Sequence, residues 1–174
     1  MKIQQHIFSI IFFTILCILI IMAWTKTVNN SKVVMAHSYS HGNKCGPMAL
    51  LGICRILDIS VGLEKVVALS NLNDFGTSMY GLSQAAKSLG LNAVGIEADL
   101  DTLTQLQKPS IIFVNNNHYI AIVGYGNNCF QVVDSGRLYT IQKAKLEKKY
   151  SGKALVISKK GDPALLAKIY KISE

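Results

Sequence analysis

Three side chains that can support nucleophilic catalysis occur along the chain in the order cysteine, histidine, aspartate. They are Cys45, which precedes a Gly-Pro pair, His118, which begins an apolar stretch, and Asp134, which ends another. A thiol becomes a good nucleophile when a base can take its proton and its surroundings lower its pKa. The order is therefore that of a nucleophile, a base and an orienting group. Taken singly, Cys45 is typical of a small buried residue, His118 of a surface histidine after a turn, and Asp134 of a turn aspartate.

The sequence after Cys45 predicts a helix that begins at or just after this thiol. Pro47 is favoured in the first turn of a helix, where its missing N–H is no loss. Apolar residues then recur at roughly helical spacing through residues 46–57. Unpaired N–H groups and the helix dipole at such an N-terminus favour a thiolate, so a catalytic cysteine would be placed there.

The elements that must position these side chains are those of an α+β domain, with helices first and an antiparallel sheet second. Helical patterns cover residues 46–57, 63–71, 81–89, 99–106 and 143–150. Short runs rich in Ile, Val, Phe and Tyr, bounded by turn residues, predict strands at 110–114, 119–125, 130–133, 138–141 and 154–158. His118 would begin one strand and Asp134 would end the next. The two would then lie side by side in an antiparallel hairpin, where they can form a hydrogen bond.

An uncharged apolar run at residues 7–24 precedes this domain. As a helix it would be about 27 Å long, close to the thickness of the hydrocarbon core. We expect a retained transmembrane anchor, because the run exceeds an ordinary signal h-region and no small-x-small site follows it directly. A signal peptide cleaved near Ala36 is the alternative. The predicted organisation is an anchor or signal segment at 1–24, a linker at 25–40 and a folded domain at 41–174.

Basic residues bear on the topology and the partners of the chain. The signal-like position of the apolar run predicts a domain outside the cytoplasm, in the periplasm or at the cell surface. Lys26 and Lys32 oppose this, since positive charges prefer the cytoplasmic side. The formal charge of +8 comes largely from lysines spread over the C-terminal third without interleaved aromatic residues. This pattern predicts a solvated basic surface, suited to lie near anionic lipids, and no nucleic-acid partner.

The four cysteines indicate neither a disulfide framework nor a metal site. No Cys-x-x-Cys pair occurs, and the Cys and His spacings match no zinc pattern. No metal or cofactor is therefore predicted. Cys54 is expected to be a small apolar residue on the helix after Cys45, and Cys129 to be partly exposed beside a turn. A disulfide between Cys54 and Cys129 is the alternative.

Together these motifs resemble the papain-like cysteine peptidases that process double-glycine leaders, the peptidase domain at the front of bacteriocin-exporting ABC transporters. The resemblance covers most of residues 44–157. Its motifs, in order, are Cys45-Gly46-Pro47, Gly81-Leu82, residues 85–91, Leu103 and Leu106 before Pro109, His118-Tyr119, Asp134 and residues 151–155.

The resemblance implies a papain-like fold in which N-terminal helices pack on an antiparallel sheet. It implies Cys45 as the nucleophile, His118 as general base and acid, and Asp134 as the group that orients the imidazole. The implied activity is cleavage of a leader or exported polypeptide after a small-residue pair such as Gly-Gly. The implied partners are that polypeptide and an exporter.

One position departs from the pattern of the family. The family places a glutamine six residues before the cysteine, where its side chain helps bind the oxyanion, and here that residue is Tyr39. Asn43 and Tyr39 are the side-chain candidates for this role, together with the backbone N–H of Cys45. Losing one oxyanion donor typically costs about 10²–10³ in rate. The departure keeps two alternatives open, a weak or inactive peptide-binding module and an acyltransferase of the phytochelatin-synthase type.

Overall fold

The computed structural model describes residues 43–162 of the chain. The apolar run at 7–24, the linker at 25–40, Tyr39 and residues 163–174 lie outside the described residues. The domain boundaries at residues 24 and 40 therefore stay predictions. Between residues 43 and 162, no helix is both long and apolar enough to cross a membrane.

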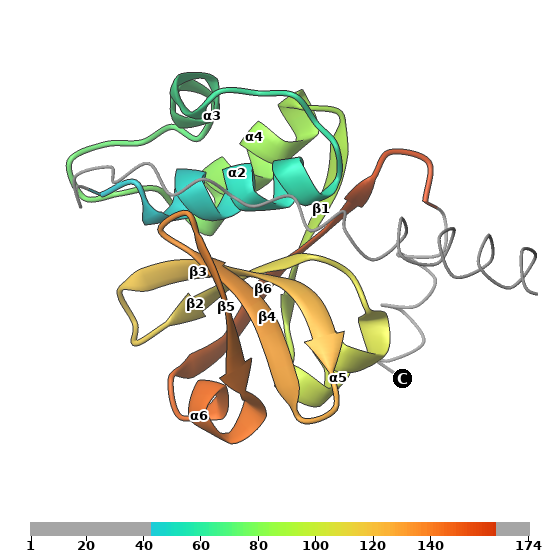
Figure 1. Cartoon of the computed structure of the whole chain (residues 1–174). Coiled ribbons are helices and arrows are strands. Elements are labelled where there is room, and N and C mark those ends of the chain that lie inside the picture. Colours follow the sequence, from blue (N-terminus) through green and yellow to red (C-terminus); the bar gives the residue numbers. More distant parts are fainter. Residues whose placement is uncertain (1–42, 163–174) are drawn as a thin grey trace, which may run out of the picture. The chain divides into compact units, whose positions relative to one another are not determined.

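One six-stranded antiparallel sheet forms the framework of the described residues (Figure 1). Its middle strands follow one another as a meander, and the last strand returns to pair with the first strand of that meander. The order across the sheet is β1-β6-β2-β3-β4-β5. The strands are β1 (Leu91–Glu97), β2 (Ser110–Val114), β3 (His118–Gly126), β4 (Cys129–Asp134), β5 (Arg137–Gln142) and β6 (Tyr150–Lys159).

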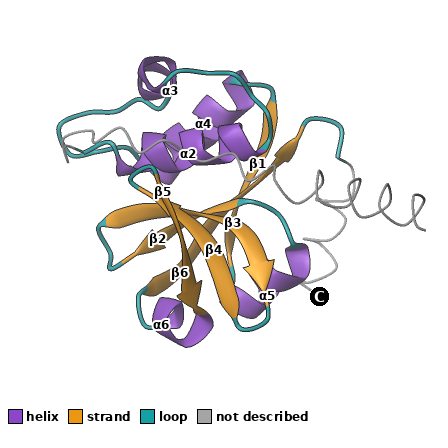
Figure 2. Cartoon of the chain, viewed as in Figure 1, coloured by secondary structure: helices purple, strands orange, loops and turns teal. Residues whose placement is uncertain are grey.

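Helices cover both faces of this sheet (Figure 2). Three of them lie on one side, which we call the α2 face, where α2 and α4 pack on the sheet and α3 packs against those two helices. Two short ones pack on the other side, which we call the α5 face. The α2 face carries α2 (Cys45–Ile56), α3 (Leu63–Leu69) and α4 (Met79–Ser88). The α5 face carries α5 (Leu100–Leu106) and α6 (Lys143–Glu147).

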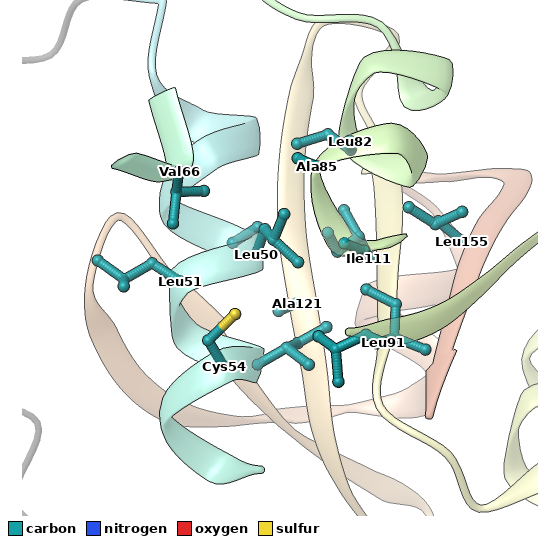
Figure 3. Close-up of a cluster of buried hydrophobic side chains, with 14 of the residues drawn as sticks. Leu50, Leu51, Cys54, Val66, Leu82, Ala85, Leu91, Ile111, Ala121 and Leu155 are labelled. Atoms are coloured by element: carbon teal, nitrogen blue, oxygen red, sulfur yellow. The ribbon is translucent and has the colours of Figure 1, made fainter. Parts of the chain in front are cut away.

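Alternate residues of the central strands supply the two cores. Ile111 and Ala121 point to the α2 face, where they pack with Leu50 and Leu82 (Figure 3). Their neighbours Ile112 and Ile120 belong to the core of the α5 face. This alternation is the period of a strand covered on both sides. It makes the face to which any strand residue points predictable from its neighbours.

Helix α2 approaches the sheet closely because it carries a glycine where it crosses β4. A Cβ placed on Gly52 would lie 2.8 Å from Cγ1 of Val133, which is nearer than side chains can pack. At the start of the same helix, a Cβ on Gly46 would lie 2.4 Å from Cγ2 of Thr77. The first contact sets how closely α2 lies on the sheet, and the second sets how closely its start, with Cys45, lies against the loop before α4.

The predicted α+β arrangement of helices on an antiparallel sheet is confirmed, with two corrections. Strand β1 is not predicted from the sequence, because only Leu91 and Ala93 in it are buried and Gly95 interrupts the pattern. The predicted helix at 143–150 is too long, since α6 ends at Glu147. Tyr150 instead begins β6, where its backbone pairs with Val114 of β2.

Candidate active site

His118 and Asp134 meet at one end of the sheet, where β3 begins and β4 ends. His118 lies two residues before Ile120, and Asp134 lies two residues after Val132; both of these neighbours belong to the α5-face core. Because strands β3 and β4 are adjacent and alternate in phase, the two polar side chains lie on the same face. Nε2 of His118 is 2.7 Å from Oδ1 of Asp134, within hydrogen-bond distance. The hydrogen bond predicted from the hairpin is confirmed.

Cys45 reaches the same place from α2. It is the first residue of the helix and is half-buried. Its thiol lies beside the imidazole of His118 and the backbone N–H groups of Tyr119 and Gly46, all of which lower its pKa by hydrogen bonding. Since Nε2 of His118 faces Asp134, the other ring nitrogen, Nδ1, is the one left for the sulfur. The structure thus brings all three predicted side chains together in one chain of contacts.

The electrostatics of this chain favour a charged pair. Burial raises the pKa of the Cys45 thiol, but the hydrogen bond from His118, the N–H of Tyr119 and the nearby imidazolium together hold that pKa below its usual value. The hydrogen bond to Asp134, followed by that to Cys45, raises the pKa of His118 to about 10 in spite of burial. The arrangement therefore favours a thiolate beside an imidazolium, the activated form of a cysteine nucleophile.

The start of α2 also offers a backbone donor. Because the helix begins at Cys45, the N–H of this residue has no acceptor within the helix. Pro47 has no N–H, and the N–H of Met48 is bonded to the carbonyl oxygen of Lys44. The N–H of Cys45 is thus placed beside the sulfur, where an anionic oxygen would form.

Of the two side chains predicted as oxyanion-hole donors, the structure describes only one. Tyr39 lies outside the described residues. Asn43 is exposed, and its side-chain amide donates a hydrogen bond to the backbone carbonyl of Asp74, in the turn between α3 and α4. That hydrogen bond uses one of its two N–H donors. A role for Asn43 as an oxyanion donor stays a prediction.

The carboxylate of Asp134 has two hydroxyl neighbours that the sequence does not reveal. Oγ of Ser135 donates to Oδ1 at 3.0 Å, and the hydroxyl of Tyr139, on the neighbouring strand β5, contributes to the low pKa of the carboxyl. The hydrogen bond to His118, together with these hydroxyls, lowers the pKa of Asp134 although burial opposes it. The strand predicted at 138–141 includes Tyr139, but which residue Tyr139 faces is known only from the register of β5 against β4.

The other cysteines differ from Cys45 in their surroundings. Cys54 is fully buried in the α2-face core, as predicted, and burial raises the pKa of its thiol to about 11. Cys129 is half-buried at the start of β4, and both residues are free thiols. Among the described residues, no three His, Cys, Asp or Glu side chains are grouped as metal ligands would be.

The fold that carries this site is that of peptidase domains from ABC transporters. The peptidase domain of Streptococcus ComA, a bifunctional ABC transporter of a quorum-sensing pathway, is 24% identical; the match covers 68% of this chain and 93% of that domain, with a TM-score of 0.62. A double-glycine motif protease from an AMS/PCAT transporter, solved with its leader peptide, is 22% identical over 68% of this chain and 86% of that one, with a TM-score of 0.61.

The sequence comparison gives the family itself. The Peptidase C39 family matches residues 34–162, which is most of the chain, so this protein belongs to that family. An uncharacterized protein of Methanothermobacter thermautotrophicus is 31% identical over 135 residues, covering 75% of this chain and 89% of that protein. The predicted resemblance to double-glycine leader peptidases is confirmed at the level of the family.

Proposed function

We propose that this protein is a cysteine peptidase that cleaves a leader or exported polypeptide with Cys45, His118 and Asp134. One observation carries the proposal: the Cys45 sulfur lies beside the His118 imidazole, which is hydrogen-bonded to the Asp134 carboxylate, at one end of the sheet. Membership of the C39 peptidase family supports the same reaction class.

The first half of the reaction uses the thiolate. The Cys45 sulfur attacks the carbonyl carbon of the scissile peptide bond, and the negative charge passes to the carbonyl oxygen. The N–H of Cys45 stabilises that oxyanion, with a side-chain donor such as Asn43 or Tyr39. The His118 imidazolium then gives its proton to the leaving nitrogen as the C–N bond breaks. A thioester on Cys45 and a free amine remain.

The second half releases the acyl group. His118, now neutral, takes a proton from a water molecule that attacks the thioester carbonyl. The C–S bond breaks, the carboxylic acid product leaves, and the thiolate–imidazolium pair is restored. Throughout, the carboxylate of Asp134 on Nε2 keeps Nδ1 of His118 directed at the sulfur and stabilises the protonated ring.

The substrate we propose is a peptide with a small-residue pair, such as Gly-Gly, at the end of its leader. The solved neighbours support this proposal, since one is a double-glycine motif protease in complex with a leader peptide. Both solved neighbours come from transporters, which makes an exporter the partner that we propose for this chain.

The test is cleavage of a synthetic leader peptide that ends in Gly-Gly, incubated with the full-length protein in detergent and followed by mass spectrometry. We expect one cut after the glycine pair. Cys45→Ala should abolish it while keeping the circular dichroism spectrum, since replacing a thiol by hydrogen at this half-buried site removes little packing. Cys129→Ala, which removes a thiol outside the site, is the matched control and should cleave normally.

The same experiment separates the alternatives. A binding module would bind the peptide with wild-type Cys45 intact and release it uncut. An acyltransferase would transfer the leader to an added amine or thiol acceptor faster than to water, giving a product of higher mass. Cleavage by the Cys45→Ala variant would contradict the assignment of the nucleophile.

A further inference from the structure

The loop that joins α3 to α4 contacts the start of α2 on both sides of Cys45 (Figure 1). Before the nucleophile, the side-chain amide of Asn43 donates a hydrogen bond to the carbonyl oxygen of Asp74 in this loop. After the nucleophile, Gly46 faces Thr77. A Cβ built on Gly46 would lie 2.4 Å from Cγ2 of Thr77, which is nearer than two carbon atoms can pack. The methyl group of Thr77 thus fills the space that a side chain at position 46 would need.

This contact explains why a glycine follows the nucleophile. Alanine is the better helix former of the two smallest residues, yet the second residue of α2 is Gly46. The backbone conformation does not require a glycine there, since the φ of Gly46 is not positive. The side chain of Leu82 also lies close, with Cδ1 3.1 Å from the same built Cβ, but its end can turn away. The branched side chain of Thr77 is therefore the neighbour that excludes a larger residue.

Thr77 is itself held in place. Its hydroxyl donates a hydrogen bond of 2.5 Å to the carbonyl oxygen of Ser70, which is fully buried at the end of α3. Because threonine branches at Cβ, a fixed Oγ1 also fixes Cγ2. Helix α4 packs against this hydrogen bond, since a Cβ built on Gly81 would lie 2.4 Å from the same carbonyl oxygen and 3.0 Å from Oγ1 of Thr77. The methyl group that contacts Gly46 is therefore attached to a buried support.

The rest of the loop is closed by its own hydrogen bonds. Asn73 and Gly76 exchange two backbone hydrogen bonds of 3.0 Å. The N–H of Phe75 donates to Oδ1 of Asn73 over 2.9 Å, inside the same turn. Ser78 then caps α4 with its side chain. Thr77 lies between this closed turn and the capped helix, so the loop can act as a fixed support for α2.

We propose that Thr77 is a positioning residue for the peptidase reaction: its methyl group, packed on Gly46, sets where the start of α2 places the thiol of Cys45. The inference rests on the proposed function, because it assigns a role within that reaction. If this support is lost, the first turn of α2 can move relative to His118. The thiol and the N–H of Cys45 then move with it. A displacement of about 1 Å in a catalytic site can cost roughly 10²-fold in rate.

The test treats Gly46 and Thr77 as a pair in a double-mutant cycle. Gly46→Ala adds the methyl group that Thr77 excludes, and we expect kcat to fall by roughly 10²-fold with a smaller change in KM. Thr77→Ser removes Cγ2 and keeps the hydroxyl, so alone it should lower kcat severalfold. In the double variant Gly46→Ala/Thr77→Ser the added methyl group has room. Its kcat should exceed that of Gly46→Ala by about tenfold or more.

Thr104→Ser is the matched control. It removes the same methyl group from a half-buried threonine on α5, whose hydroxyl likewise donates to a backbone carbonyl oxygen, that of Leu100. Because this threonine lies on the other side of the sheet from α2, we expect kcat and KM to stay at their wild-type values.

A second readout needs no substrate. The rate of alkylation of Cys45 by iodoacetamide, measured by peptide mass spectrometry on protein that circular dichroism shows to be folded, reports the thiolate directly. This rate should fall in Gly46→Ala and in Thr77→Ser, and it should recover in the double variant. If Gly46→Ala does not fold, Thr77→Ser alone decides the outcome.

Two results would overturn the proposal. Wild-type kcat and alkylation in Thr77→Ser, even with reduced thermal stability, would make Thr77 merely structural. A folded Gly46→Ala that keeps wild-type kcat, or whose loss Thr77→Ser does not reverse, would show that the two residues do not act through this contact. A wild type that alkylates as expected but cuts no peptide overturns the proposed function alone.

Discussion

At the scale of single residues, the site depends on which side chains contact one another. The types and order of Cys45, His118 and Asp134 could be predicted from the sequence, since the hairpin already placed the last two side by side. The placement of Tyr139 on the same face as Asp134 could not, because it depends on the register between β4 and β5. A one-residue slip of that register would turn Tyr139 to the other face.

Replacing Asp134 by Asn tests the part of the site that acts through charge. The hydrogen bond to Asp134 is the first cause that raises the pKa of His118 to about 10, so the imidazolium persists up to that pH and is lost above it. In Asp134→Asn the charge is gone, and the pKa of His118 falls. We expect the alkaline limb of the kcat/KM profile to move well below pH 10, and kcat to fall.

The measurement is the NMR titration of the His118 ring alongside the pH–rate profile. Asp101→Asn, which removes an exposed carboxylate from α5, is the control and should leave both unchanged. A His118 pKa that is the same in Asp134→Asn as in the wild type would show that Asp134 does not stabilise the imidazolium.

At the scale of elements, the site depends on how closely α2 lies on the sheet. The helix could be predicted from its apolar spacing and from Pro47, and its start at Cys45 agrees with the structure. The close contact between Gly52 and Val133 could not be predicted, because a glycine within a helical pattern does not say which strand it crosses. The sequence does not predict strand β1 for a related reason. An edge strand with one glycine and two buried residues has only a weak alternation of apolar and polar residues.

Enlarging Gly52 should therefore disturb both stability and catalysis. In Gly52→Val, the new side chain meets Val133 in a packed core, so α2 must shift away from β4. We expect the free energy of unfolding to fall by about 1–3 kcal/mol, the usual cost of overpacking. Urea denaturation followed by circular dichroism measures it.

Gly95→Ala is the matched control, because no atom lies within 4 Å of a Cβ placed there. It should leave stability nearly unchanged or slightly improved. If α2 positions the thiol, Gly52→Val should also slow the alkylation of Cys45 under conditions where the protein is still folded. Equal stability of the two variants would contradict the role given to this contact.

At the scale of the whole molecule, the order of the strands exceeds what local patterns can predict. The meander from β2 to β5 follows from short turns between neighbouring strands. The return of β6 to the far edge of β2, with β1 beyond it, depends on pairings between distant residues such as Ile111 with Leu155. The attachment of the molecule to a membrane rests on residues 7–24, which lie outside the described residues.

We propose that residues 7–24 anchor the protein and that the catalytic domain lies outside the cytoplasm. Their long uncharged sequence motivates the anchor, and their signal-like position motivates export. We expect the full-length protein to stay in the membrane pellet after alkaline carbonate extraction. Protease added to intact spheroplasts should digest the domain while a cytoplasmic marker survives.

Each half of this proposal can be contradicted separately. Release of the protein by carbonate would contradict the anchor and point to cleavage near Ala36. Protection of the domain from protease in intact spheroplasts would contradict export and place the site in the cytosol.

The residues of the site are far apart in the sequence, and this affects when the site can form during translation. Cys45 lies on the first helix of the described residues, whereas His118 and Asp134 lie on two strands made in succession much later. A nascent chain therefore exposes its nucleophile long before the imidazole and carboxylate that activate it have been synthesised. Until β3 and β4 have been translated and have paired beneath α2, the thiol keeps an ordinary reactivity. The order of translation thus delays the chemistry until the domain is nearly complete.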